Sequence, residues 1–118
     1  MTSNPTELEM KAWAKYSVAD KIATRLIAIS HNAASKLEEA KRQSWMAETN
    51  ASEADEYHKI STMGAAVYRA RDVAQTSVAA LIAHARSDEA VSKREKAGLK
   101  AMSITLESRA QLAQKETE

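Results

Sequence analysis

Residues 57–85 read YHKISTMGAAVYRARDVAQTSVAALIAHA, and the spacing of their side chains decides the fold. Alternating steps of three and four residues connect Tyr57, Ile60, Gly64, Val67, Arg71, Ala74, Val78, Leu81 and Ala85. This is the heptad period of an α-helix that packs lengthwise against another helix. We call these nine positions the 57–85 stripe. The spacing predicts that the stripe is a seam, either for packing within the chain or for self-association.

The composition extends the helical prediction to the rest of the chain. The 118 residues include 24 alanines, but only two glycines, one proline and no phenylalanine. Strands favour β-branched and aromatic residues, and the turns between them need Gly, Pro and Asn. Alanine is the strongest helix former. We therefore expect an alanine-rich, all-α protein that forms a single helical domain over residues 1–118.

Capping side chains accompanied by acids mark the expected helix starts at residues 4–7, 50–56 and 87–89. In the first of these segments Asn4 can cap and Pro5 suits the first helical position. Acids near a helix N-terminus also complement the helix dipole. These features predict a bundle of three long helices, over about 5–48, 53–86 and 88–115. The tail is expected to fray from about residue 114. A break at His31-Asn32 would divide the first helix and make four.

The bulky apolar side chains are too few for the length of helix expected. Leucine, isoleucine and valine together number 18, and alanine adds little to a core because each methyl group contributes only about 0.8 kcal/mol. Two arrangements fit this composition: a slender bundle formed by one chain, or a bundle completed by another chain. We favour the second, which makes the protein a homo-oligomer.

Arg71 is a charged residue at a seam position of the 57–85 stripe. One interpretation is that its aliphatic stem crosses the apolar surface and its guanidinium reaches water. The other is a buried or interfacial ion pair that fixes the register of the helices. Asp20, Glu38 and Glu39 are the candidate partners for that pair. The first interpretation is favoured, because long cationic side chains commonly behave in this way.

A local run of cations makes nucleic-acid binding the main alternative function. Its candidate contacts are Lys93, Arg94, Lys96 and Lys100. Clustered Lys and Arg on one face are what phosphate contacts require. However, the net charge of the whole chain is only +1, and Glu95 interrupts the run. A charged run on a helix is usually its solvated face, so oligomerisation would be needed to collect enough positive potential.

Catalysis and metal binding have little support in the sequence. The chain lacks cysteine, a glycine-rich phosphate loop and a nucleophile elbow. Asp55-Glu56-Tyr57-His58 is a single near match to the Glu-x-x-His pairs of di-iron bundles. Because the acids also suit the first turn of a helix, we favour that simpler explanation. The expectation is therefore no enzyme, no metal site and no cofactor.

The expected function is a non-enzymatic, self-assembling module for protein–protein interaction, of the assembly, adaptor or inhibitor type. This expectation rests on analogy with other small helical proteins. No apolar run approaches the length of about 20 residues that a membrane span needs, so we expect a soluble, cytoplasmic protein without a membrane partner. The sequence does not identify any protein partner other than a second copy.

Overall fold

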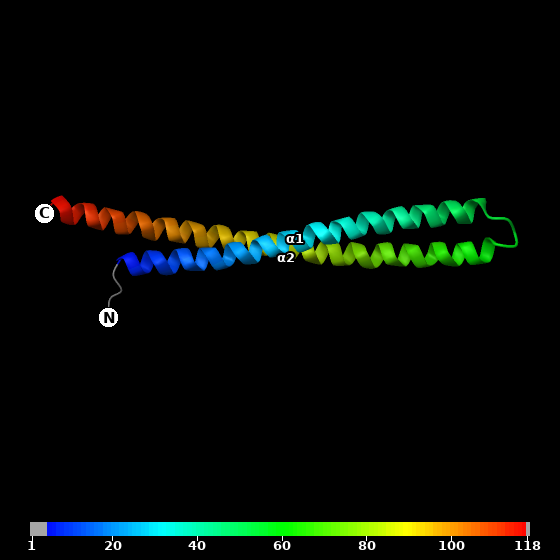
Figure 1. Ribbon diagram of the computed structural model, residues 1–118, viewed down its shortest axis with the longest axis horizontal. Coiled ribbons are helices and arrows are strands. Elements are labelled where there is room, and N and C mark those ends of the chain that lie inside the picture. The colour runs from blue at the N-terminus through cyan, green and yellow to red at the C-terminus, as the bar shows by residue number, and fades with distance from the viewer. Residues whose placement is uncertain (1–4, 118) are drawn as a thin grey trace. The chain divides into compact units, whose positions relative to one another are not determined.

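The computed structural model describes residues 5–117, which form two long α-helices (Figure 1). Helix α1 spans Pro5–Glu53 and helix α2 spans Lys59–Thr117. The all-α prediction is confirmed, and α1 begins at the predicted proline. The capping role expected for Asn4 lies outside the described residues. Neither helix contains a stretch long and apolar enough to cross a membrane within the part of the chain described.

The two helices contribute to two compact units. Unit 1 contains the described residues up to Leu26 and those from Arg86 onward, and unit 2 contains Ile27–Ala85. In unit 1 the helices run antiparallel. The indole Nε1 of Trp13 donates a hydrogen bond to Thr105 Oγ1 at 2.8 Å, and Arg94 pairs with Asp20 at 3.5 Å. The residue number on α2 therefore falls as the number on α1 rises.

Small residues form the contact between the helices in unit 1. The fully or largely buried side chains there are Ala12, Ala23, Ser87, Ala90, Ala101 and Ser108. They follow the heptad spacing, with Tyr16 and Arg94 half-buried at intervening positions. Side chains this small allow two helix axes to approach closely. We call this contact the inner seam.

The inner seam has the same character in unit 2. On α1 it is formed by Ser30, Ala33, Leu37, Ala40 and Ser44, of which the two serines and Ala40 are buried. On α2 the half-buried positions of the seam are Thr62, Ala66, Arg69, Val73, Thr76, Ala80 and Ala83. Alanine, serine and threonine therefore dominate the contact along the whole of unit 2.

The prediction of three helices is wrong, because α2 continues through residues 87–89. Ser87 does not cap a helix: it is 6% exposed and lies in the inner seam. Glu89 does not mark a helix N-terminus either, since it pairs with Lys93 one turn later at 3.3 Å. The first helix is also continuous through His31-Asn32. The helix at the C-terminal end extends to Thr117, beyond the start of the expected frayed tail.

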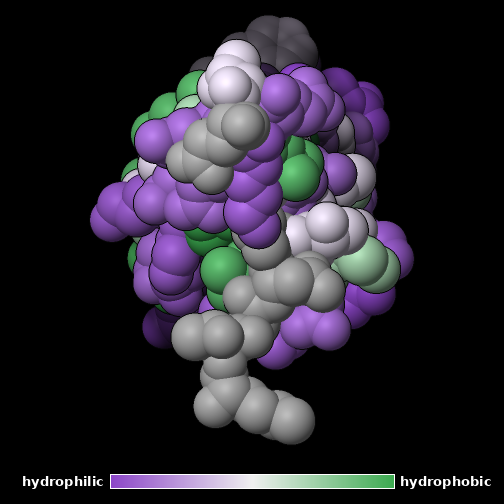
Figure 2. Space-filling view, turned by 90° about the vertical axis from the view of Figure 1, so that its left-hand side faces the viewer, coloured by the Kyte–Doolittle hydropathy of each residue, from purple (hydrophilic) through white to green (hydrophobic). Residues whose placement is uncertain are grey.

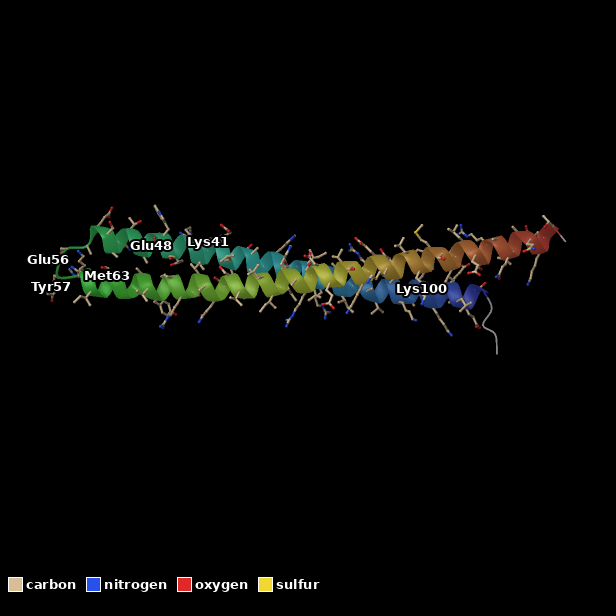
Figure 3. All side chains as sticks on the ribbon, turned by 180° about the vertical axis from the view of Figure 1, so that it is seen from behind. Lys41, Glu48, Glu56, Tyr57, Met63 and Lys100 are labelled. Atoms are coloured by element: carbon tan, nitrogen blue, oxygen red, sulfur yellow. The ribbon has the colours of Figure 1, made fainter. Side chains whose placement is uncertain are left out.

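The connection between α1 and α2 begins and ends later than predicted. The first helix extends to Glu53, and the second starts at Lys59 instead of residue 53. Asp55 closes the turn, because the backbone N–H of His58 donates to Asp55 Oδ1 at 2.9 Å and to its carbonyl oxygen at 3.2 Å. The carbonyl of His58 then accepts from the backbone N–H of Thr62 at 3.0 Å. Figure 3 labels Glu56 and Tyr57 in this connection and Met63 in α2.

Candidate association surface

The 57–85 stripe does not pack against α1. Its large members in unit 2 are exposed: Ile60 by 85%, Val67 by 61%, Val78 by 56% and Leu81 by 70%. Both this stripe and the inner seam repeat every three or four residues, but they lie on opposite sides of α2. Packing within the chain is therefore not the role of the stripe. From here we call its helical members, Ile60, Gly64, Val67, Arg71, Ala74, Val78, Leu81 and Ala85, the outer stripe.

The outer stripe is open along its length and flanked by uncharged side chains. A Cβ atom added at Gly64 would have no heavy atom within 4 Å. The neighbouring exposed side chains on one flank include Met63 and Ala70, and those on the other flank include Tyr68, Gln75 and Ile82. The remaining member of the predicted seam, Tyr57, precedes α2 and is 89% exposed, with its ring 5.1 Å from that of His58.

Arg71 has none of the ion pairs that the sequence suggested. Among the described residues, Asp20 pairs with Arg94, Glu38 with Lys41 and Glu39 with Arg42. The candidate carboxylates are therefore all engaged elsewhere. Arg71 is exposed on the outer stripe, which agrees with the interpretation that its guanidinium reaches water.

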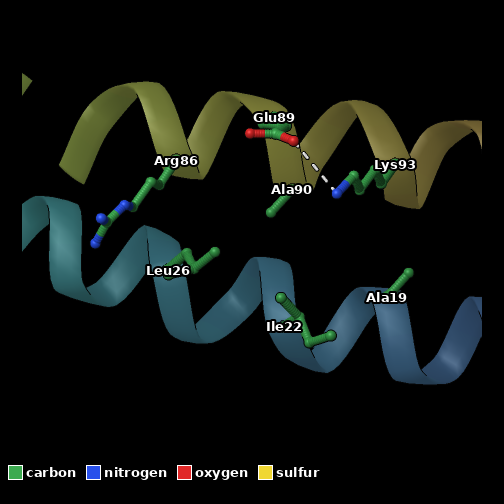
Figure 4. A pocket seen from close by; sticks show the side chains of 7 residues that line it. All are labelled: Ala19, Ile22, Leu26, Arg86, Glu89, Ala90 and Lys93. Atoms are coloured by element: carbon green, nitrogen blue, oxygen red, sulfur yellow. Dashed lines mark ion pairs between the residues drawn. The ribbon is translucent and has the colours of Figure 1, made fainter. Parts of the chain in front are cut away.

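A second surface lies in unit 1, where cations border an apolar groove. The groove has a volume of about 240 Å³ and is floored by Ala19, Ile22, Leu26 and Ala90 (Figure 4). Arg86, Glu89 and Lys93 extend over it from α2. Glu89 is the carboxylate that pairs with Lys93.

A further groove of about 240 Å³ continues this arrangement. Leu8, Ala12, Ala97 and Ile104 provide its apolar lining, and Lys11, Lys15 and Lys100 line its edges. Lys93 and Lys100 are seven residues apart on α2, so both grooves open on the same side of unit 1. Five cations and one carboxylate therefore line the two grooves. Figure 2 looks onto the end of unit 1 where α1 begins, and there hydrophobic side chains (green) reach the surface among hydrophilic ones (purple).

The structure separates the predicted nucleic-acid contacts. Lys93 and Lys100 border the grooves, and Lys96 is exposed. Arg94 is different, because its half-buried side chain is directed toward Asp20. Sequence reasoning missed Lys11 and Lys15, which belong to the other helix. The spacing of Lys11 and Lys15, four residues apart and beside Leu8, is the feature that could have revealed them.

An exposed hydrogen-bond cluster on α1 of unit 2 contains the clearest shift in pKa. The Arg42 side chain donates to both carboxylate oxygens of Glu39, and Gln43 Nε2 donates to Oε1 at 3.0 Å. Hydrogen bonds from Arg42, and then from Gln43, lower the pKa of Glu39. The same pairing raises the pKa of Arg42.

The near match to a metal motif forms a local pair in the connection. The Nδ1 atom of His58 is 2.9 Å from Asp55 Oδ1, and both side chains are exposed. In the part of the chain that the structure describes, no group of three His, Asp or Glu side chains is arranged to hold a metal ion. The contact between Asp55 and His58 belongs to the turn that starts α2.

No protein-family model, curated protein or solved structure matches this chain.

Proposed function

We propose that this protein is a non-enzymatic helical module that associates with other protein chains, and with its own copies first. One observation carries the proposal: the side chains that the fold buries fully are small, and most of the large apolar ones remain exposed. The buried residues among those described are all alanine or serine. Twenty large hydrophobic residues are exposed in the same part of the chain.

The energetics of apolar surface favour association. Burying a Val, Leu or Ile side chain is worth about 1.5–3 kcal/mol relative to leaving it exposed. Single exposed apolar residues are normal on a protein surface, but contiguous apolar patches indicate interaction sites. The outer stripe is contiguous, because its members follow one side of α2 in steps of three and four residues. A second chain on this side would gain that burial without disturbing the inner seam.

The inner seam explains why the outer stripe is available. An antiparallel contact made of alanine and serine uses little of the apolar surface of the chain. Most of the large side chains therefore face away from the partner helix, and Tyr16, Leu37 and Val73 are half-buried exceptions in the seam. Ala23 and Ala101 are 0% exposed, whereas Ile60 and Leu81 are 85% and 70% exposed. This division supports a scaffold whose outer surface is reserved for another chain.

Nucleic-acid binding is the second candidate, and the grooved side of unit 1 favours it. Lys11, Lys15, Arg86 and Lys100 border the grooves together with Lys93, which Glu89 partly neutralises. Phosphate contacts would use these cations, and binding would weaken steeply with salt. This candidate ranks second because the groove floors are apolar, a property that phosphate contacts do not require.

A cytoplasmic location is part of the proposal, since a chain without cysteine suits a reducing compartment.

Sedimentation equilibrium tests the proposal. The wild-type chain should have a concentration-dependent mass above the 12.9 kDa of one copy. Val67→Asp places a charge in the outer stripe and should weaken association at least tenfold, because a carboxylate buried without a partner is strongly unfavourable. Its helix content should stay unchanged, since Val67 is 61% exposed in the lone chain. Ser35→Asp, at an exposed position of α1, is the matched control and should associate as the wild type does.

A wild-type mass of a single copy at every concentration would overturn the proposal. Association that Val67→Asp and Ser35→Asp leave equally strong would overturn the outer stripe as the contact surface, because the contact would then lie elsewhere. Titration with duplex and single-stranded DNA at two salt concentrations tests the second candidate. Salt-sensitive binding that Lys15→Glu with Lys100→Glu abolishes would support that candidate.

A further inference from the structure

The outer stripe has an order of large and small side chains that complements its own reverse. From the N-terminal end its members are Ile60, Gly64, Val67 and Arg71, and from the C-terminal end they are Ala85, Leu81, Val78 and Ala74. Placed side by side, these two series match a large side chain with a small one, or valine with valine, at each step. The pattern is therefore one that a second, antiparallel copy of the same stripe would fill.

We propose that two copies of this chain pair through the outer stripe in antiparallel orientation, with Gly64 of each copy opposite Leu81 of the other. This inference rests on the proposed function and adds the partner, its orientation and its register. The same register places Val67 opposite Val78, Ile60 opposite Ala85 and Arg71 opposite Ala74. In an antiparallel pair of helices, an a position of one heptad faces a d position of the other, and every pair named here satisfies that rule.

Gly64 and Leu81 form the most specific pair of the proposed register. Leu81 is 70% exposed, so its side chain has no place in the fold of the lone chain. The space beside Gly64 is empty, because a Cβ atom at that position would meet no heavy atom within 4 Å. A leucine from the second copy would occupy that space, because close packing fills voids at a helix contact. The pair occurs twice in the dimer, once on each side of its two-fold axis.

The low charge of the outer stripe also favours a second copy of the chain as the partner. Between Ile60 and Ala85 the only charged residues are Arg69, Arg71 and Asp72, and of these only Arg71 belongs to the outer stripe. Opposite Ala74, the Arg71 stem has room to lie along the contact while its guanidinium reaches water. An acidic or nucleic-acid partner would find one cation on this side of α2. A second outer stripe, which carries the same single cation among otherwise uncharged side chains, matches it along its length.

Other arrangements of two stripes fit less well. A parallel pair in register places Arg71 against Arg71, where like charges repel, and Gly64 against Gly64, which leaves a void. An antiparallel pair shifted by one heptad places Gly64 opposite Ala74, two small residues, and Val67 opposite Arg71. It also leaves Leu81 opposite Tyr57, which lies outside the helix. The proposed register alone pairs every large apolar side chain with a small one or with valine.

The flanks of the stripe agree with the proposed register. On one flank, Tyr68 of each copy would lie beside Gln75 of the other, so the phenol and the amide can form a hydrogen bond. On the other flank, Ala70 would lie beside Ser77. Charged side chains are absent from these flanking positions in the sequence of residues 61–82. These flanks therefore bring no like charges together, and the two Arg71 residues, about 4.5 Å apart along the axis, both extend their guanidinium groups past the contact to water.

Disulfide mapping tests the inference, and the absence of native cysteine makes it specific. Val67→Cys and Val78→Cys are prepared as separate full-length variants, one with a mass tag. Their masses are first measured under reducing conditions, and they are then mixed and oxidised. The mixed product, Cys at 67 joined to Cys at 78, should predominate at least tenfold over either self-linked product. In the proposed register the two copies of position 67 are about 16 Å apart along the axis, too far for a disulfide.

A matched control and the remaining outcomes complete the test. Ser35→Cys mixed with Val78→Cys measures random collision and should give little cross-linked product. Self-linking of Val67→Cys in a chain that associates would overturn the antiparallel register and leave the proposed function intact. Association with no more mixed product than this control would place the contact elsewhere and also overturn the inference. A wild-type chain that remains a single copy would overturn the proposed function together with the inference.

Discussion

The ring of Tyr16 lies against Gly98 on the opposite helix of unit 1. A Cβ atom at position 98 would be 3.2 Å from Cε2 of that ring and 3.3 Å from Cδ2. The Tyr16 ring also meets Trp13 edge to face, with the ring centroids 5.7 Å apart. Glycine at position 98 therefore provides the space that this aromatic side chain of the inner seam requires.

Gly98→Ala is expected to stabilise the fold less in the wild type than in a Tyr16→Ala background. Replacing a mid-helix glycine with alanine gains about 1 kcal/mol from helix propensity. In the wild type, that gain is offset because the Tyr16 ring must move by a few tenths of an ångström. Denaturant unfolding of the four chains measures the difference. An equal gain in both backgrounds would show that Tyr16 and Gly98 do not interact.

The inner seam is predicted to reject large side chains. Ala101→Leu should cost about 1–3 kcal/mol of unfolding free energy, because Ala101 is fully buried and overpacking forces the helices apart. Ala14→Leu is the control, since Ala14 is exposed on α1 and leucine is also a good helix former. Thermal and denaturant unfolding measure both variants. Equal stability of the two would contradict the close contact between α1 and α2 in unit 1.

Ser108→Ala is expected to stabilise the chain. The hydroxyl of Ser108 is buried and has no hydrogen-bond partner among the described residues. Burying a hydroxyl without a hydrogen bond costs free energy, and alanine removes that cost and has a higher helix propensity. Together the two effects should raise the unfolding free energy by about 1 kcal/mol or more. Ser103→Ala, at an exposed position of the same helix, gains the propensity alone. If both substitutions change the unfolding free energy equally, Ser108 is hydrogen-bonded after all.

The Glu39 carboxylate is predicted to stabilise α1 in a pH-dependent way. Because Arg42 and Gln43 lower its pKa in the folded chain, Glu39 binds a proton less readily there than in the unfolded chain. Its contribution is therefore complete above the ordinary value of 4.5 and is lost as the pH falls through the lowered pKa. The stability difference between wild type and Glu39→Gln should shrink in acid. A difference that is independent of pH would contradict this cause.

Much of the fold could be predicted from the sequence, because helix propensity and heptad spacing are local properties. The start of α1 at Pro5 agrees with the helix start predicted at residues 4–7. The number of helices could not be predicted in the same way. Acids at an exposed helix position and acids at a helix N-terminus look alike in sequence, and Glu89 is of the first kind.

The two stripes of α2 are harder to tell apart in the sequence. Both have heptad spacing, and the larger side chains of Ile60, Val67 and Leu81 suggested the wrong one for packing within the chain. Helices separated by alanine and serine can approach more closely, so size alone does not identify the buried side. The sequence predicted only the cations of α2 in this groove. Lys11 and Lys15 of α1 lie near Lys100 only because the two helices pack side by side.

The mass of the wild-type chain in solution, followed from low to high micromolar concentration, tests the central claim most directly. The mass is expected to rise from the 12.9 kDa of one copy toward twice that value, with helix content constant throughout. A mass that stays at one copy over the whole range would contradict it, because the exposed apolar side of α2 would then have no second copy to cover it.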